Sequence, residues 1–432
     1  MGRLPLEGIR VAATTIVWAG SFAEMLLADW GAEVIKVESL DRFPTSTRGY
    51  LPRPTQLYVQ NAPPTAAYPQ NEAGARPWNR CSLFNYHARN KLSCTMDLTR
   101  PEGKELFKRL IAKCDVFIEN NAYGVVDRLG IGYEVLKEIT PGLIMVSLPG
   151  FGATGPYKDF RGFGMHQEAF AGHTWLRGYP DLDPSATAPV VHNDACAGAN
   201  AAYAVMIALV QRRRTGAGQF IDLAQTEAAI SHHADAVLDY TMNGRAREST
   251  GNRHASAAPC GAYRCRGEDE WVAITIYDDL DWTGFCRTLG NPAWTKEDRF
   301  SSSLTRWNNQ DALDRLVENW TSRQSSYEVM YALQEQGVAA GPVISNKDAF
   351  DDPQLIERGQ FEELHQEECG NYLTPGLLWR AEYTPNRIRL PAVRLGEHNE
   401  YVYKEVMGIS DDEYARLEKA GHIGMDLAPH LR

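Results

Sequence analysis

The chain has 432 residues, a formal net charge of −11 and 44% hydrophobic residues. A chain of this length exceeds what one simple hydrophobic core usually supports, so we expect two domains or one elaborated domain. The acidic balance excludes non-specific nucleic-acid binding, which needs a basic face. The hydrophobic share is typical of a soluble globular protein.

The cysteines and the apolar runs bear on metal binding and location. The eight cysteines are spread along the chain without a C-x-x-C pair, a usage that predicts reduced thiols and offers no recognisable zinc motif, so we expect no bound metal. The N-terminus lacks the apolar core of a signal peptide. The longest apolar run, residues 195–210, contains Asn200 and is shorter than the roughly 20 residues of a membrane span. We therefore expect a cytoplasmic protein with no nucleic-acid or membrane partner.

The N-terminal region alternates between strand and helix patterns. We predict a strand over residues 9–13, a helix over 22–30 that Gly31 stops, and a second strand over 33–38. Such a βαβ unit implies a parallel sheet with a right-handed crossover. The turn holds only Gly20 and no G-x-G-x-x-G fingerprint, so binding of NAD or FAD in the usual way is not expected.

Further strands are predicted near residues 89–98, over 115–119 and over 143–148, with a helix starting at Pro101. Residues 41–80 have no sustained periodicity and are predicted as one long loop. Regular alternation of strands and helices predicts a doubly wound α/β sheet. Ligands of such sheets bind beyond the carboxyl ends of the strands.

The second half of the chain changes character. Residues 219–223 are predicted as a strand and 226–242 as one amphipathic helix, and mixed α and β patterns with charged helices then continue to about residue 340. We therefore expect three parts. They are the first part of a large domain (1–225), a linker helix with a small α+β domain (226–340), and a C-terminal part that completes the large domain (341–432).

The stretch V-V-H-N-D-A-C-A-G, residues 190–198, leads into an apolar helix predicted over 199–212. A helix that is apolar all round belongs in a protein interior, so Asp194 at its mouth is held rigidly. One interpretation is an N-cap that accepts hydrogen bonds from free backbone N–H groups. The other is a carboxylate that the helix dipole keeps ionised and that acts as a nucleophile. The local pattern leaves both open.

An ordered set of motifs runs through nearly the whole chain. Its N-terminal part is G-A-E-V-I-K-V-E, N-K-L-S-C-T-M-D-L and D-V-F-I-E-N-N-A-Y-G-V-V-D-R-L-G. S-L-P-G-F-G, N-D-A-x-A-G, R-R-T-G-x-G-Q, G-N-R-H and L-G-E-H follow. Together they resemble the class III CoA-transferase family, to which formyl-CoA and carnitine CoA-transferases belong. The α-methylacyl-CoA racemase is a relative of this family.

The resemblance implies a fold, an assembly and a substrate. The fold is a Rossmann-like large domain with a parallel sheet, built from both ends of the chain, plus the smaller α+β domain. Two such chains interlock like linked rings in a homodimer, and a heteromer with a homologous chain is also possible. Coenzyme A or acyl-CoA is a substrate rather than a tightly bound cofactor, and a carboxylic acid is the second substrate.

The resemblance also implies which residues bind CoA, at the turn and strand ends of the large domain. Arg128 is the expected phosphate partner, because a guanidinium suits phosphate geometry. The expected contacts are Trp18, Ala19, Met96, Asp97, Leu98, Thr99, Asn120, Asn121, Arg128, Leu148, Gly150 and Phe151.

Asp194 matches the nucleophilic aspartate of the family. The implied reaction moves CoA from an acyl-CoA thioester to a free carboxylic acid through an aspartyl anhydride and an aspartyl-CoA thioester. His192 is expected to be a structural neighbour, since a carboxylate nucleophile needs no deprotonation. One alternative is racemisation at the α-carbon, which needs a second base; Phe163 stands at the position of that histidine, and His166 lies three residues further on. Another is a non-catalytic CoA-binding subunit of a heteromeric transferase.

The chain departs from the formyl-CoA transferase pattern at three places. The arginine that follows the second strand there is Ser39 here, with Arg42 as a candidate substitute, and the glutamine of the first turn is Trp18. The glycine-rich loop of the small domain has no counterpart, and the nearest segment is residues 255–261. We therefore expect an acid bulkier than oxalate.

Overall fold

The computed structural model describes residues 3–187 and 190–432. These residues divide into two compact units. The first unit consists of the described residues within 1–173, 189–238 and 359–432, and the second of those within 174–188 and 239–358. Both ends of the chain therefore belong to one unit, and the other is inserted between them.

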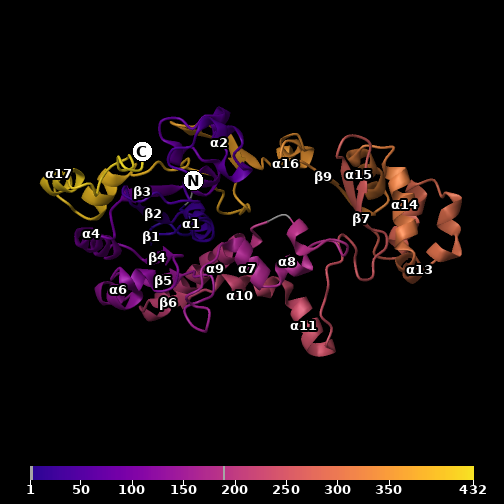
Figure 1. The fold of residues 1–432 in the computed structure, drawn as a ribbon, viewed down its shortest axis with the longest axis horizontal. Coiled ribbons are helices and arrows are strands. Elements are labelled where there is room, and N and C mark those ends of the chain that lie inside the picture. The colour runs from indigo at the N-terminus through magenta and orange to yellow at the C-terminus, as the bar shows by residue number, and fades with distance from the viewer. Residues whose placement is uncertain (1–2, 188–189) are drawn as a thin grey trace. The chain divides into compact units, whose positions relative to one another are not determined.

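The first unit holds a six-stranded sheet in which all strands run parallel (Figure 1). The strand order is β3-β2-β1-β4-β5-β6, the order of doubly wound dinucleotide-binding folds. The predicted parallel α/β sheet is confirmed. The strands are β1 (Arg10–Ala13), β2 (Glu33–Glu38), β3 (Lys91–Thr95), β4 (Val116–Glu119), β5 (Ile144–Ser147) and β6 (Gln219–Asp222).

Helices cover both faces of this sheet, which explains why its strands read as nearly continuous apolar runs. On one face, α1 (Ala19–Asp29) and α9 (His192–Thr215) share a core with β1, β4 and β5. On the other face lie α4 (Pro101–Ile111), α6 (Tyr133–Ile139) and the C-terminal α17 (Asp411–Lys419). Figure 1 shows α17, in yellow, beside α4, and Arg109 pairs with Glu413 between them at 2.8 Å.

The packing of α1 against α9 is close enough to depend on a glycine. A Cβ added to Gly198 would lie 2.5 Å from the carbonyl oxygen of Ala19. Only glycine therefore lets the two backbones approach at this point. The contact joins the beginning of α1 to the first turns of α9.

Residues 41–80 are not the single loop that the sequence predicts. They contain short helices because Arg48, fully buried, anchors the segment to the sheet. Its Nε and Nη2 donate to the two carboxylate oxygens of Glu38 at the end of β2, at 2.6 and 2.7 Å, and its Nη1 donates to Asn79 Oδ1 at 3.0 Å. The elements of this region are α2 (Gln56–Gln60), η1 (Pro64–Ala66), η2 (Pro69–Asn71), η3 (Pro77–Asn79) and α3 (Ser82–His87).

The prediction of one continuous helix over residues 226–242 is also wrong, because the helix is interrupted. A 3-10 turn, η5 (Ser231–His233), separates α10 (Gln225–Ile230) from α11 (Ala234–Asn243). The other connecting elements are α5 (Val125–Arg128), α7 (Gly164–Phe170), α8 (His173–Leu176), η4 (Pro184–Ala186) and η9, a π-helix (Tyr401–Val406).

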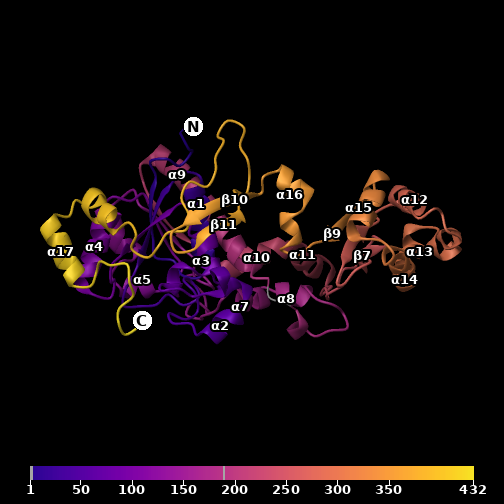
Figure 2. The same cartoon turned by 90° about the horizontal axis from the view of Figure 1, so that it is seen from above.

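The second unit is built on an antiparallel sheet of order β7-β8-β9. Strand β9 (Ala339–Val343) pairs with β8 (Trp271–Thr275), and the chain returns to the first unit at Gly359. There β10 (Phe361–Gln366) and β11 (Gly370–Pro375) form a hairpin (Figure 2). The remaining elements are β7 (Cys260–Arg264), α12 (Asp279–Thr288), η6 (Ala293–Lys296), η7 (Asp298–Phe300), α13 (Ser303–Asn308), α14 (Gln310–Thr321), α15 (Ser326–Glu335), η8 (Asp348–Phe350) and α16 (Pro353–Glu357).

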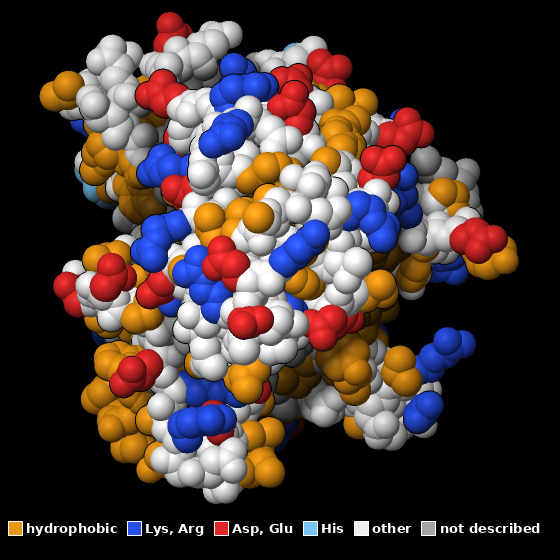
Figure 3. Space-filling view, turned by 90° about the vertical axis from the view of Figure 1, so that its right-hand side faces the viewer, with side chains coloured by type: hydrophobic (Ala, Val, Ile, Leu, Met, Phe, Trp, Pro, Cys, Tyr) orange, Lys and Arg blue, Asp and Glu red, His pale blue; other side chains and the backbone are white. Residues whose placement is uncertain are grey.

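The surface carries charges of both signs. On the face shown in Figure 3, acidic and basic side chains are interspersed rather than gathered by sign. Among the described residues, no helix combines the length and the hydropathy needed to cross a membrane.

Candidate functional site

The predicted site residues follow strands that end at one edge of the sheet. Trp18 and Ala19 follow β1, residues 96–99 follow β3, residues 120–121 follow β4 and residues 148–151 follow β5. Parallel strands present their carboxyl ends at the same edge, and here the strand order reverses between β1 and β4. Doubly wound sheets bind their ligands at this reversal.

A pocket of about 660 Å³ opens at this edge. Ser39, which replaces the arginine of the formyl-CoA transferase pattern, and Arg42, its candidate substitute, are part of its wall. Arg128 is exposed at the end of α5 and is not part of the wall, although Val125 and Val126 of the same helix are. The predicted residues that do line the pocket are Met96, Asp97, Leu98, Thr99 and Asn121.

Two of these residues, Met96 and Asp97, support the wall of the pocket and are themselves buried. Met96 is buried in the core beneath the sheet. The Asp97 carboxylate accepts hydrogen bonds from the Thr99 N–H at 2.9 Å and the Thr99 hydroxyl at 2.6 Å. Asp97 therefore fixes the turn after β3, and Leu98 and Thr99 are the more exposed members of the segment.

The turn from β1 to α1 connects the pocket with Asp194. Ile16, in the pocket wall, is held by Asn120, whose Oδ1 accepts the Ile16 N–H at 2.7 Å and whose Nδ2 donates to the Ile16 carbonyl at 2.8 Å. Val17 has φ 57°, a left-handed conformation that is rare for a β-branched residue and that occurs where the surrounding structure enforces it. Two residues further on, the Ala19 N–H faces the Asp194 carboxylate and acts to lower its pKa.

Asp194 is not the N-cap that one interpretation expected. Helix α9 begins at His192, its N-cap is Val191 with φ 55°, and Asp194 is the third residue of the first turn. The helix starts earlier than predicted, and Asn193 in its first turn is held by Glu168 and Gln167 of α7. Asp194 therefore points away from its own helix end and toward the start of α1.

The Asp194 carboxyl is poorly solvated. Asp194 is 4% exposed, and its Oδ2 has no hydrogen-bond partner among the described residues. Burial raises the pKa of Asp194 to about 6, the nearby charge of Glu168 adds to this rise, and the Ala19 N–H opposes it. The carboxyl is thus ionised at neutral pH but carries a charge that little around it compensates.

Buried polar residues of α7 surround the first turn of α9, and the sequence motifs did not single them out. Glu168 Oε1 accepts the Asn193 N–H at 3.0 Å, and Gln167 Oε1 accepts from Asn193 Nδ2 at 2.5 Å. A Cβ added to Gly164 would lie 2.0 Å from Asp194 Oδ2. Helix α7 is short, so only its tertiary packing determines which of its residues face inward.

The other predicted residues lie in the turn after β5 and at the start of α1. Leu148 is buried in the core, and the Gly150 carbonyl accepts the Thr226 N–H at 3.0 Å. Phe151 packs among aromatic rings, with Phe170 at 5.1 Å between centroids. Trp18 Nε1 is buried with no hydrogen-bond partner among the described residues.

Doubly wound sheets bind nucleotide-containing ligands at the reversal of strand order, where this pocket lies. The buried carboxylate that one turn connects to it is a residue type that can act as a nucleophile. The model of CoA-transferase family III matches residues 6–399. The chain belongs to this family.

Individual relatives of the chain support this family membership. The succinyl-CoA–D-citramalate CoA-transferase of Chloroflexus aurantiacus is 32% identical over 415 residues, which cover 96% of this chain and 97% of that protein. The α subunit of a succinyl-CoA–L-malate CoA-transferase from Chloroflexus aurantiacus is 30% identical, over 96% of this chain and 92% of the subunit. Among solved structures, a CaiB/BaiF family protein from Brucella suis has a TM-score of 0.80 and 30% identity, and the match covers 94% of this chain and all of that one.

The desolvated Asp194 carboxyl predicts a stability effect with a definite pH dependence. Because its pKa is raised in the folded state, its contribution favours folding below about pH 4 and is lost as the pH rises through 6. Asp194→Asn should therefore stabilise the protein at pH 8, by about 2–3 kcal/mol for a pKa difference of this size. The difference should vanish near pH 4. Urea denaturation of both proteins at the two pH values, with EDTA present, measures it, and a variant less stable than the wild type at pH 8 would contradict it.

Proposed function

We propose that the protein is a CoA-transferase that moves CoA from an acyl-CoA thioester to a free carboxylic acid, with Asp194 as the nucleophile. The observation that carries this proposal is the buried Asp194 carboxylate, whose Oδ2 has no partner among the described residues and which lies at the first turn of α9. A carboxylate that is neither paired nor well solvated keeps its nucleophilicity, and it needs no general base.

The reaction proceeds by four exchanges at carbonyl carbons. Asp194 attacks the thioester carbonyl, so that a C–O bond forms and the C–S bond breaks. The products are CoA thiolate and a mixed anhydride between Asp194 and the acyl group. The thiolate then attacks the aspartyl carbonyl, releasing the donor acid and forming an aspartyl-CoA thioester. The acceptor carboxylate attacks this thioester to give a second anhydride and free thiolate. Finally the thiolate attacks the acyl carbonyl of the acceptor, which yields the new acyl-CoA and restores Asp194.

The Ala19 N–H supports these steps. It faces the Asp194 carboxylate, so it also faces the oxygen on which negative charge develops when thiolate or acid attacks the aspartyl carbonyl. A backbone donor held in place before reaction stabilises such charge without reorganisation. The glycine contact between α1 and α9 keeps this donor at the carboxylate.

CoA is proposed to run along the β1–α1 turn. Its thioester lies at Asp194, and its nucleotide end occupies the 660 Å³ pocket, which Leu98, Thr99 and Asn121 line. Arg128 at the end of α5 and Arg42 in the pocket wall are the cations proposed for its phosphates. Trp18, with its unpartnered Nε1, is proposed to contact the chain of CoA between the two ends.

The names of the relatives support a substrate class. Two of them use succinyl-CoA with D-citramalate or L-malate, which are 2-hydroxydicarboxylic acids. We propose succinyl-CoA as donor and a dicarboxylic acid of this size as acceptor. A screen of carboxylic acids with succinyl-CoA, analysed by mass spectrometry of the CoA products, identifies the pair.

The two other candidate functions have less support. In a racemase, a second base must approach the same carbon as Asp194, whereas His166 is exposed and its Nδ1 accepts the Phe163 N–H at 3.1 Å. A non-catalytic subunit would not need a buried nucleophile. Relatives named as α and β subunits of one transferase leave a heteromer as a possible assembly.

Assembly with a second copy is supported by an exposed stripe on α9. Tyr203, Met206, Ile207 and Val210 lie on one face of the helix at helical spacing, and Tyr203 is 60% exposed. Within a single chain α9 is therefore not buried all round, because only its other face packs on α1 and the sheet. A continuous apolar stripe of this kind is typical of an interface, and we propose that an interlocked second chain covers it.

Covalent labelling tests Asp194 directly. During turnover a transferase carries an aspartyl anhydride or thioester, so incubation with succinyl-CoA and then hydroxylamine should convert Asp194 to a hydroxamate on one peptide. Asp194→Asn should stay folded, bind CoA and lose transfer by several orders of magnitude. A racemase or a binding subunit would leave the wild type unlabelled, and that result would overturn the proposal.

The phosphate assignment predicts a loss of affinity. Arg128→Ala should weaken CoA binding by about 1.5–3 kcal/mol, the usual range for hydrogen bonds to charged groups, with less change in turnover at saturation. Calorimetry measures it, with Arg42→Ala for comparison and the exposed Arg315→Ala, in the second unit, as matched control. Equal affinities for Arg128→Ala and Arg315→Ala would return Arg128 to an ordinary surface role.

Interlocking predicts an unusually persistent dimer. Interlocked rings separate only after a chain unfolds, so the dimer should survive dilution to nanomolar concentrations at which ordinary dimers dissociate. Mass photometry at nanomolar protein checks this prediction. A reversible monomer at that concentration would show that the chains merely touch.

A further inference from the structure

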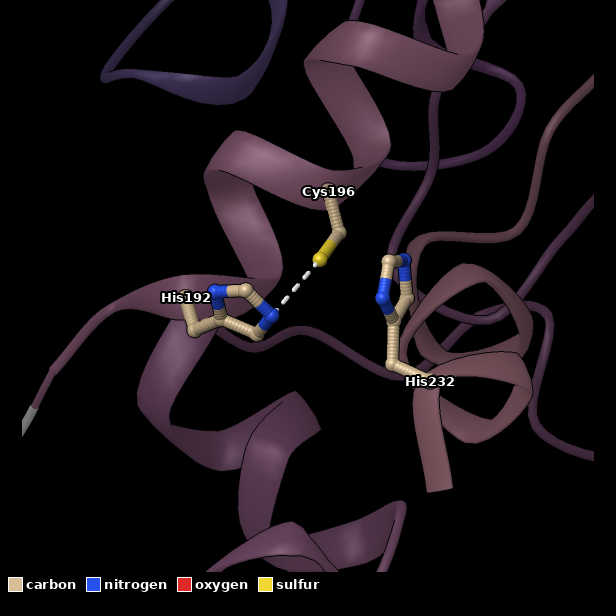
Figure 4. Close-up of side chains that lie close together, drawn as sticks. All are labelled: His192, Cys196 and His232. Carbon is tan, nitrogen blue, oxygen red and sulfur yellow. Dashed lines mark hydrogen bonds between the residues drawn. The ribbon is translucent and has the colours of Figure 1, made fainter. Parts of the chain in front are cut away.

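Three side chains with metal-binding atoms converge beside the first turn of α9. His192 and Cys196 come from α9 and His232 from η5. Their ligand atoms all lie within 4.8 Å of one another, and Figure 4 shows the thiol and the two imidazoles turned toward one another. The Cys196 Sγ lies 3.1 Å from His192 Nε2.

The backbone explains why these residues meet. His192 and Cys196 are four residues apart, so they occupy the same face of the helix, the spacing at which helical ligand pairs bind zinc. His232 reaches them because η5 interrupts the helix between α10 and α11. The rings of His192 and His232 are 5.5 Å apart between centroids. The search for C-x-x-C pairs could not detect a site assembled in this way.

We propose that His192, Cys196 and His232 bind a Zn²⁺ ion. Zinc prefers nitrogen and sulfur ligands in tetrahedral geometry, with Zn–N near 2.0–2.1 Å and Zn–S near 2.3 Å. These bond lengths put neighbouring ligand atoms roughly 3.3–3.6 Å apart. The three atoms here are already within 4.8 Å, so small rotations of the side chains complete the geometry.

The surroundings suit an exchangeable cation. His192 and His232 are exposed while Cys196 is buried, so the ion has access from solvent. Binding replaces the S–H bond with an S–Zn bond and releases one proton to solvent. Three protein ligands leave a fourth position open, as in catalytic zinc sites.

The position of this cluster makes it a site in its own right. It uses the two residues that flank Asp194 by two positions on either side, but not Asp194 itself. The three ligand atoms meet whether or not the proposed transfer reaction takes place. Its test is therefore a binding measurement, which remains valid whether or not Asp194 is a nucleophile.

Zinc titration of the full chain, without a histidine tag, tests the site. Protein freed of metal by a chelator is titrated with Zn²⁺ in competition with a chromogenic chelator. The wild type should bind one equivalent per chain. Cys196→Ser and His232→Ala should each weaken binding by roughly 100-fold or more, since loss of a direct ligand exceeds the 10–100-fold typical of outer-shell changes. Cys260→Ser and His430→Ala, of the same residue types elsewhere in the chain, should bind as the wild type does.

Cobalt substitution gives a second readout. Co²⁺ bound by a thiolate has a charge-transfer band in the near ultraviolet, which the wild type and both control variants should show and Cys196→Ser should lack. Circular dichroism of each variant checks that it is folded. A wild type that takes up no Zn²⁺ would overturn the proposal. So would a folded Cys196→Ser protein that binds zinc as tightly as the wild type, because the ion would then be elsewhere.

Discussion

The close packing of α1 on α9 is the constraint on which the site depends. Gly198 lets the two backbones approach, and this approach removes water from the first turn of α9 and brings the Ala19 N–H to Asp194. The energy for holding an ionised, largely unpartnered carboxylate comes from the apolar core beneath it. Residues of both helices share that core with the central strands of the sheet.

The β1–α1 turn extends this constraint to the pocket. Ile16 lies in the pocket wall and Ala19 at Asp194, so only Val17 and Trp18 separate the two ends of the site. Asn120 holds the turn from the next strand in space through two hydrogen bonds to Ile16. A substrate whose recognition group and reacting group are far apart can be bound along such a turn, because the turn is rigid.

Helix α9 serves several purposes on different faces. One face packs into the core, its first turn carries Asp194, and His192 and Cys196 share the face that meets His232. The stripe of Tyr203, Met206, Ile207 and Val210 remains exposed. Its sequence looked apolar all round because apolar residues stand both on the face that packs into the core and on this exposed stripe.

The sequence by itself determined the parallel sheet, the positions of its strands and the family. Buried parallel strands leave runs of apolar residues that periodicity detects, and β2 was predicted with the bounds it has. The ordered motifs predicted a site at Asp194 and the strand ends. Only the tertiary structure decided which polar groups meet there. Glu168, Gln167 and His232 come from short or interrupted helices, whose inward faces no periodic pattern reveals.

The order of residues 41–80 likewise depends on one buried contact, Arg48 with Glu38, between segments that are separate in the chain. Contacts of this kind are set by packing in space, so no local pattern of residues encodes them.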